Sequence, residues 1–218
     1  MSPRGVATPD VKEQLFQAAE RVLARHGPDG LTSRAITDEA GVAKGLLFNH
    51  FSDLDQFLAE LVLDRSHHAA SHAAQLPPRA GTSTVPANLV DFALSLLRSP
   101  AFAVAGIIHA RPLLMGRLHH ISSGRPYAVL SDVEKSFAAY LAAEKTLGRI
   151  PAATDSDTLA FILMGTVHHI FMTNLTESSG LRPRLQNFAK GRLSNRCRNL
   201  LQKRRTMSHG SSKRPSHR

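Results

Sequence analysis

One stretch, from Leu31 to Phe51, constrains the fold of this chain more than any other. Its residue order predicts a short helix, a tight turn and a second short helix. Thr32 is suited to cap the first helix, because a threonine hydroxyl accepts a hydrogen bond from a free N–H group of the first turn. Gly41 falls where that helix has to end, and glycine takes a positive φ without steric cost. We expect the second helix to begin at residue 43 or 44 and to end near residue 50.

The apolar residues of this stretch are spaced so that they can close one small core. They are Leu31, Ile36, Ala40, Val42, Leu47 and Phe51. A helix, a glycine turn and a second helix form the helix-turn-helix pattern, in which the second helix enters the DNA major groove. An amphipathic helix that starts near residue 10 and ends before Gly27 is expected to complete a three-helix head.

Residues 41–51 read GVAKGLLFNHF and resemble the recognition helix of the TetR-type (TetR/AcrR-like) transcriptional regulators. The family pattern is roughly G-V-S-K-G-T-L-Y-x-H-F. The matching residues are Gly41, Val42, Lys44, Gly45, Leu47, His50 and Phe51. The resemblance covers about residues 11–64. It implies an all-α fold with a helix-turn-helix head and a helical body, and a homodimer whose affinity for operator DNA responds to a small ligand.

The chain departs from the family pattern at several positions. Ala43 replaces a serine or threonine, Leu46 a threonine and Phe48 a tyrosine, so three hydroxyl groups that could contact DNA are missing. Family members also often carry a lysine near the start of the fourth helix, where this chain has Asp53 and Asp55. The predicted head is therefore poor in positive charge.

Nine residues of the head are the predicted DNA-binding residues. They are Thr32, Ser33, Arg34, Lys44, Gly45, Leu46, Phe48, Asn49 and His50. Hydroxyl and N–H groups at a helix start can hold a phosphate, and Asn49 has the amide that pairs with adenine. Gly45 leaves room for the backbone to approach DNA closely. For Thr32 a purely capping role stays open, and for His50 a packed, structural role.

Charge is unevenly distributed along the chain. The formal net charge is +10, yet residues 1–65 hold seven Lys/Arg against ten Asp/Glu, whereas residues 182–218 hold twelve Lys/Arg and no acid. The basic excess is thus a property of the C-terminal end. A single cysteine, Cys197, excludes an internal disulfide. The N-terminus has no apolar signal region, so we expect a cytoplasmic protein.

Helical spacing also organises the rest of the chain. We expect helices over residues 53–71, 88–98, 101–109, 126–147 and 155–176, with less regular ones over 113–121 and 181–204. The helix over 101–109 is apolar nearly all round, which favours a central position and a pocket wall. The predicted ligand pocket is formed by Phe102, Ile107, Ile108, Phe137, Tyr140 and His168. The family resemblance implies that the last two long helices form the dimer interface.

These observations predict four segments. They are a flexible arm (1–8), a helix-turn-helix DNA-binding domain (9–64), a helical effector-binding and dimerisation domain (65–202) and a basic disordered tail (203–218). The expected function is a sequence-specific transcriptional regulator. It would be a homodimeric repressor that a small apolar or amphipathic ligand releases from a near-palindromic double-stranded DNA operator.

Two alternatives stay open at this stage. The basic tail could drive non-specific nucleic-acid binding. A helical metal- or histidine-dependent enzyme could use His67, His72, His109 or His168. No enzyme signature is present in the sequence, and we therefore expect no catalytic residue, no cofactor and no metal, and no membrane partner.

Overall fold

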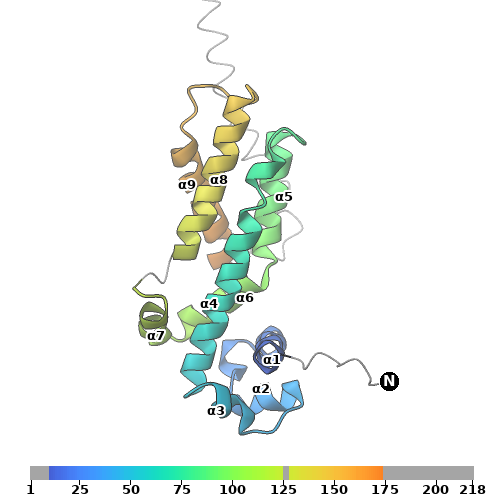
Figure 1. Cartoon of the computed structure of the whole chain (residues 1–218), viewed down its shortest axis with the longest axis vertical. Helices are drawn as coiled ribbons and strands as arrows, with labels where there is room; N and C mark the ends of the chain where they lie inside the picture. Colours follow the sequence, from blue (N-terminus) through green and yellow to red (C-terminus); the bar gives the residue numbers. More distant parts are fainter. Residues whose placement is uncertain (1–9, 125–127, 174–218) are drawn as a thin grey trace, which may run out of the picture. The chain divides into compact units, whose positions relative to one another are not determined.

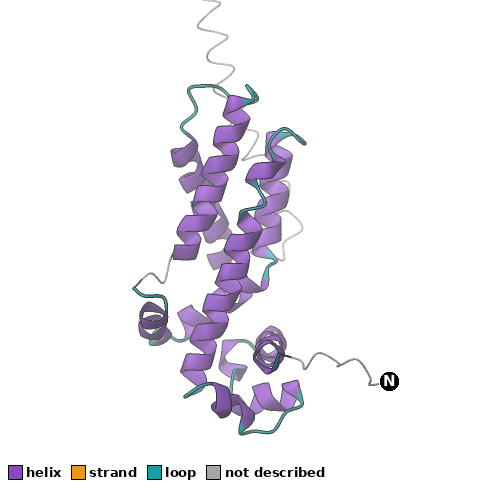
Figure 2. Cartoon of the chain, viewed as in Figure 1, coloured by secondary structure: helices purple, strands orange, loops and turns teal. Residues whose placement is uncertain are grey.

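Every element of the described chain is a helix. The computed structural model describes residues 10–124 and 128–173 (Figure 1), and Figure 2 shows these residues as helices joined by loops. The all-α prediction is therefore confirmed. The predicted arm over residues 1–8, the helix over 181–204 and the basic tail over 203–218 lie outside the described residues.

The helices follow the predicted order. Their bounds are α1 Val11–His26, α2 Ser33–Ala40, α3 Leu46–His50, α4 Leu54–Ala73, α5 Val85–Leu97, α6 Pro100–Ala110, α7 Leu114–Ile121, α8 Ala128–Thr146 and α9 Ser156–Met172, with single 3-10 turns η1 Pro28–Gly30 and η2 Pro77–Arg79. Most ends lie within three residues of the predicted ones. Within the described residues no single helix is long and apolar enough to cross a membrane, although α5 and α6 together meet that criterion by length and composition.

The chain divides into two compact units. Of the described residues, unit 1 comprises 10–73, 96–124 and 128–133, and unit 2 comprises 74–95 and 134–173. Unit 1 thus contains α4, α6 and α7 in addition to the three helices of the predicted head. The functional domain boundaries at residues 8, 64 and 202 stay predictions.

Unit 1 is held together by one continuous apolar core. In Figure 1, α1, α2 and α3 gather around the N-terminal half of α4. The rings of Phe16, Phe51 and Phe57 meet at the centre, with centroids 5.0–6.2 Å apart. The helices α6 and α7 pack against α4, and α6 also packs against α1. They add Val104, Ile107, Leu114 and Leu118 to this core, each at most 3% exposed.

Unit 2 combines an aromatic contact with a buried row of hydrogen-bonded polar side chains. The rings of Phe92 on α5 and Phe137 on α8 meet edge to face at 5.2 Å. Beside them, the Asn88 side chain donates to the Tyr140 hydroxyl at 3.0 Å, and the Gly81 N–H donates to the Glu144 carboxylate at 3.2 Å. All three polar side chains are at most 1% exposed. Burial, together with a hydrogen bond to Glu144, raises the pKa of Tyr140, so its hydroxyl stays protonated as a donor.

Candidate nucleic-acid interface

The turn of the helix-turn-helix has the predicted geometry. The Thr32 hydroxyl accepts a hydrogen bond from the N–H of Ala35 at 3.1 Å, which caps α2. Gly41 ends α2 in the left-handed region, with φ 68° and ψ 32°. The N–H of Val42 then donates to the carbonyl of Thr37 at 3.0 Å, which satisfies a free carbonyl of the last turn. Both the cap and the glycine stop are confirmed.

The second helix is shorter than the sequence predicted. It begins at Leu46 instead of residue 43 or 44, and Lys44 and Gly45 belong to the turn before it. Ala43 supplies no side-chain cap, and no side-chain cap bonds the start of α3. Glycine and an uncapped start both disfavour an earlier first turn, so the predicted start was wrong.

The stretch has one buried face and one exposed face. Ile36 and Leu47 are fully buried, and Phe51 is 3% exposed. The predicted DNA-binding residues lie on the other face. Thr32, Arg34, Lys44, Gly45, Phe48, Asn49 and His50 are exposed, and Ser33 and Leu46 are partly exposed. A rigid core therefore supports a continuous exposed strip of these side chains.

Several cations near this strip are engaged by acids of the head. Arg34 lies 3.5 Å from Asp38 one turn along α2, and both side chains are mostly exposed. Arg21 on α1 bonds Glu39 at 2.6 Å, and Arg25 bonds the same carboxylate. Lys44 is exposed at the turn. Such exposed pairs are worth little in water, so Arg34 can exchange its partner for a phosphate at low cost.

The acidic start of α4 is paired with two arginines that the sequence analysis did not connect to it. Arg117 on α7 bonds Asp53 at 2.7 Å, and Arg111 at the end of α6 lies 3.5 Å from Asp55. Hydrogen bonds from the N–H of Gln56, and then the charge of Arg117, lower the pKa of Asp53. The head was predicted to be poor in positive charge, and Arg111 and Arg117 thus supply two positive charges to it from α6 and α7.

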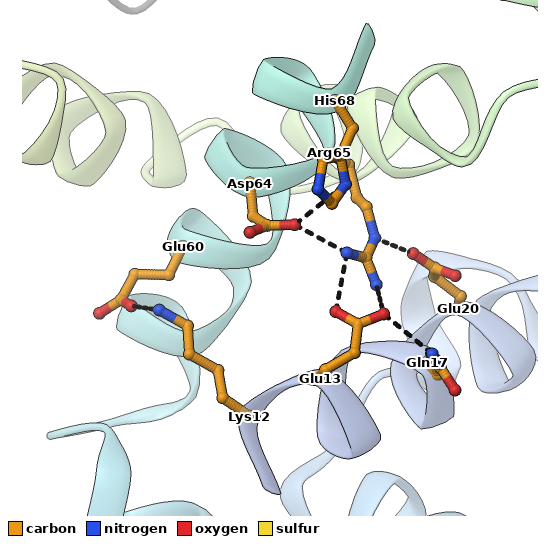
Figure 3. A network of polar contacts seen from close by, with 8 residues as sticks. All are labelled: Lys12, Glu13, Gln17, Glu20, Glu60, Asp64, Arg65 and His68. Carbon is orange, nitrogen blue, oxygen red and sulfur yellow. Dashed lines mark hydrogen bonds and ion pairs between the residues drawn. The ribbon is translucent and has the colours of Figure 1, made fainter. Parts of the chain in front are cut away.

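Helix α1 is fixed to α4 by a guanidinium group (Figure 3). Arg65 on α4 donates from Nη1 and Nη2 to both oxygens of Glu13 at 3.0 and 2.9 Å, and from Nε to Glu20. Its Nη1 also donates to Asp64 at 2.7 Å. The side chain is 6% exposed and stacks over Phe16, 5.5 Å from the ring centroid. No periodicity of the sequence indicates these contacts, because Arg65 and Glu13 lie on different helices.

The six predicted pocket residues are divided between the two units. Phe102, Ile107 and Ile108 lie in unit 1, where Ile107 is buried in the core and the other two are partly exposed. Phe137 and Tyr140 are fully buried in unit 2, and His168 is exposed on α9. A shared pocket stays a prediction. Among the described residues, no group of three or more His, Cys, Asp or Glu could hold a metal ion.

Sequence comparison assigns the stretch that this geometry singles out. The family model described as "Bacterial regulatory proteins, tetR family" matches residues 15–61, from α1 into α4. The head of this chain is therefore of the TetR type. The HTH-type transcriptional repressor AcnR of Corynebacterium diphtheriae is 28% identical over 64 residues, which are 29% of this chain and 34% of AcnR. An uncharacterized HTH-type transcriptional regulator of Haemophilus influenzae is 35% identical over 54 residues, 25% of this chain and 29% of that protein.

The fold likeness to solved structures extends well beyond the head. GusR of Salmonella enterica has a TM-score of 0.61 at 16% identity and covers 86% of this chain and 98% of its own. A putative TetR-family regulator of Mesorhizobium loti gives 0.64 at 17% identity, with 88% and 96% covered. The curated relatives match over only about a third of their own length. Both curated relatives are described as HTH-type transcriptional regulators.

Proposed function

We propose that this protein is a sequence-specific DNA-binding transcriptional regulator that acts as a homodimeric repressor. One observation carries the proposal. The strip from Lys44 to His50 is exposed, while the other face of the same short segment is anchored in a core by Ile36, Leu47 and Phe51. A rigid, exposed short helix after a glycine turn is the element that helix-turn-helix proteins place in the major groove.

The exposed strip offers each kind of contact that DNA recognition uses. Thr32, Ser33 and Arg34 lie at the start of α2, where free N–H groups and a guanidinium suit a phosphate. Asn49 can pair with adenine, and Leu46 and Phe48 can contact thymine methyl groups. Lys44 and His50 supply donors on either side of these residues. We assign Asn49 and the apolar side chains to base reading and Arg34 to positioning on the backbone, and we leave both roles open for Lys44.

Lys44→Ala tests whether this strip meets DNA. If Lys44 contacts a base, operator binding is expected to weaken by about 1–3 kcal/mol, and if it contacts a phosphate, the salt slope of binding is expected to fall by about one. Lys135→Ala, which removes an exposed lysine from α8, is the matched control and leaves both quantities unchanged. Titration of labelled operator at several salt concentrations measures both. Unaltered affinity and slope for Lys44→Ala would remove Lys44 from the contact set.

We place the dimer contact on an exposed face of α9. Phe161, Gly165, His168 and Met172 recur at helical spacing on one side of this helix and are all exposed. Phe161 is 66% exposed and Met172 is 46% exposed. Apart from its chain neighbours and the backbone of its own helix, no described atom lies within 4 Å of the position that a Cβ on Gly165 would take. A glycine in an exposed helix centre costs about 1 kcal/mol relative to alanine, and close approach of a second helix is a reason to keep it.

Phe161→Glu is expected to separate the dimer. Burying a glutamate in an apolar contact is unfavourable, and aromatic residues at the centre of an interface often contribute at least about 2 kcal/mol. The dimer dissociation constant should rise at least about 30-fold, as measured by sedimentation equilibrium. Leu113→Glu, which changes a leucine that is 88% exposed in unit 1, should leave the mass unchanged. A dimer of native stability in Phe161→Glu would show that α9 is not the interface.

The remaining parts of the proposal follow from dimeric DNA binding. Two heads should read half-sites about 34 Å apart, or a multiple of this, on a near-palindromic operator. A small apolar or amphipathic ligand would shift the equilibrium toward a form that does not fit this spacing. Support comes from similar structures, one of which, from Saccharomonospora viridis, is a complex with choline. Because the operator lies on the chromosome, we place the protein in the cytoplasm.

A further inference from the structure

The helix-turn-helix segment is held at both of its ends by the corner that α6 and α7 form. Residues 32–52 contain α2, the turn and α3. Just before this segment, the carbonyl of Leu31 accepts a hydrogen bond from Nη2 of Arg111 at 2.8 Å. Just after it, the carboxylate of Asp53 accepts one from Arg117 at 2.7 Å. Arg111 ends α6 and Arg117 lies on α7, so both contacts come from the α6–α7 corner.

The segment itself has few anchors of its own. Helix α3 has five residues, and Leu47 is its buried residue. Its start has no side-chain cap. A helix of little more than one turn with one buried side chain is not stable alone, and its direction is set by what fixes its flanks. The flanking contacts therefore determine the orientation of α3 to a greater extent than they would for a longer helix.

The corner is in turn fixed to the core of unit 1. Val104 and Ile107 on α6 and Leu114 and Leu118 on α7 lie in the same apolar cluster as Ile36, Leu47 and Phe51 of the helix-turn-helix. Arg111 is the more enclosed of the two arginines, with 29% of its side chain exposed, against 48% for Arg117. Asp53 is held from a second side, because its Oδ1 also accepts the N–H of Gln56 at 2.7 Å. Both arginines thus lie next to core residues of α6 and α7, so each can define the position of its partner.

We propose that Arg111 and Arg117 are positioning residues for DNA binding, which hold the two ends of residues 32–52 and so set the direction of α3. The inference rests on the proposed function and adds to it that the reading unit is discontinuous in sequence. It is completed by α6 and α7, which lie beyond the matched residues 15–61. Neither arginine touches DNA in this account.

The two arginines differ in expected effect. A charge-assisted hydrogen bond to a carbonyl of a buried residue is worth more than a half-exposed ion pair. Arg111→Met is therefore expected to lower operator affinity about 10-fold or more, and Arg117→Met about 2- to 5-fold. Arg111→Lys should regain part of the affinity, because lysine donates to Leu31 but cannot reach two partners in a fixed fork. Arg98→Met, which removes an exposed arginine of the same unit, is the matched control and should bind as the native protein does.

Three readouts on the full chain separate positioning from other roles. Affinity is measured at a temperature where circular dichroism shows each variant fully folded, so that a stability loss alone cannot lower it. Affinity for a non-operator duplex and the salt slope should both stay at native values. Unchanged operator affinity in Arg111→Met would overturn the proposal. A salt slope of binding lower by about one, together with equal losses of affinity for the operator and the non-operator duplex, would also overturn the proposal. The arginine would then contact a phosphate.

Hydrogen exchange tests the same proposal without DNA. In Arg111→Met the amides of residues 33–50 should exchange faster, while those of α9 keep native rates. Native exchange in residues 33–50 would contradict the positioning role. If the native protein prefers no duplex sequence, the proposed function fails, and the exchange experiment still decides whether the corner holds the segment.

Discussion

Arg65→Met is expected to lower the free energy of unfolding of unit 1 by about 2–4 kcal/mol. The guanidinium is 6% exposed and bonds Glu13, Glu20 and Asp64, and removing it leaves three carboxylates without their shared partner (Figure 3). Removing one partner of a fully buried ion pair costs about 3–5 kcal/mol. The expected loss is smaller, because Glu13 and Asp64 are more than a third exposed and regain water.

The loss should depend on pH. Hydrogen bonds from Arg65 hold the pKa of Glu13 below its usual value of 4.5. A carboxyl whose pKa is lower in the folded state contributes stability above its unfolded pKa, and loses it as the pH falls through the folded pKa. The difference in stability between the native protein and Arg65→Met should therefore be largest near neutral pH. It should shrink below about pH 4.5, as the Glu13 carboxylate becomes protonated.

Urea unfolding followed by circular dichroism measures this difference, since the chain contains no tryptophan. Arg65→Lys should recover less than half of the loss, because an ammonium group cannot bind Glu13 through two parallel bonds. Arg34→Met is the control. Its ion pair with Asp38 is exposed, and removing it should cost no more than about 0.5 kcal/mol. A loss in Arg65→Met no larger than in the control would show that the network adds nothing to the contact between α1 and α4.

Gly45→Glu is expected to abolish operator binding while the helical fold stays intact. Gly45 has φ −75° and ψ −14°, a conformation open to every L-residue. Apart from its two chain neighbours, no described residue has an atom within 4 Å of the position that its Cβ would take. Nothing in the described chain therefore requires glycine at this exposed position. A side chain and a negative charge there would instead meet the DNA backbone, with an expected loss of at least about 100-fold in operator affinity.

Two further variants control the result. Gly45→Ala adds one methyl group and should give an intermediate loss, because it separates the surfaces without adding charge. Ala103→Glu adds the same charge at an exposed position on α6 and should bind nearly as the native protein does. Electrophoretic mobility shift with a selected operator, together with circular dichroism of each variant, gives both affinity and fold. Native affinity in Gly45→Glu would refute the groove placement of α3.

Local signals of the sequence predicted the parts of the fold that depend on local chemistry. The roles of Thr32 and Gly41 could be predicted because a cap and a positive φ are properties of one residue and its neighbours. The start of α3 could not be placed from the same signals. Lys44 is compatible with a first helical turn, and the lack of a cap together with Gly45 decides where the helix begins.

Contacts between segments that lie far apart in the sequence could not be predicted. From the sequence, the negative charges of Asp53 and Asp55 were expected to disfavour DNA binding. In the structure, Arg117 pairs with Asp53 and Arg111 lies close to Asp55. These pairs join residues more than fifty positions apart, and no spacing rule connects such positions. The helix over 101–109 was predicted to be apolar all round and central. It contributes to the core of unit 1, but Ala103 and His109 on its other side are exposed.

We expect the exposed side chains between Lys44 and His50 to read a base sequence in the major groove. Selection of bound duplexes from a random DNA pool by the full-length protein tests it most directly. We predict enrichment of one near-palindromic sequence, whose half-sites are centred about 34 Å apart or a multiple of this. The enrichment should be lost with Gly45→Glu and kept with Ala103→Glu. A pool that stays random after repeated selection, although the protein is folded and retains DNA, would contradict the claim.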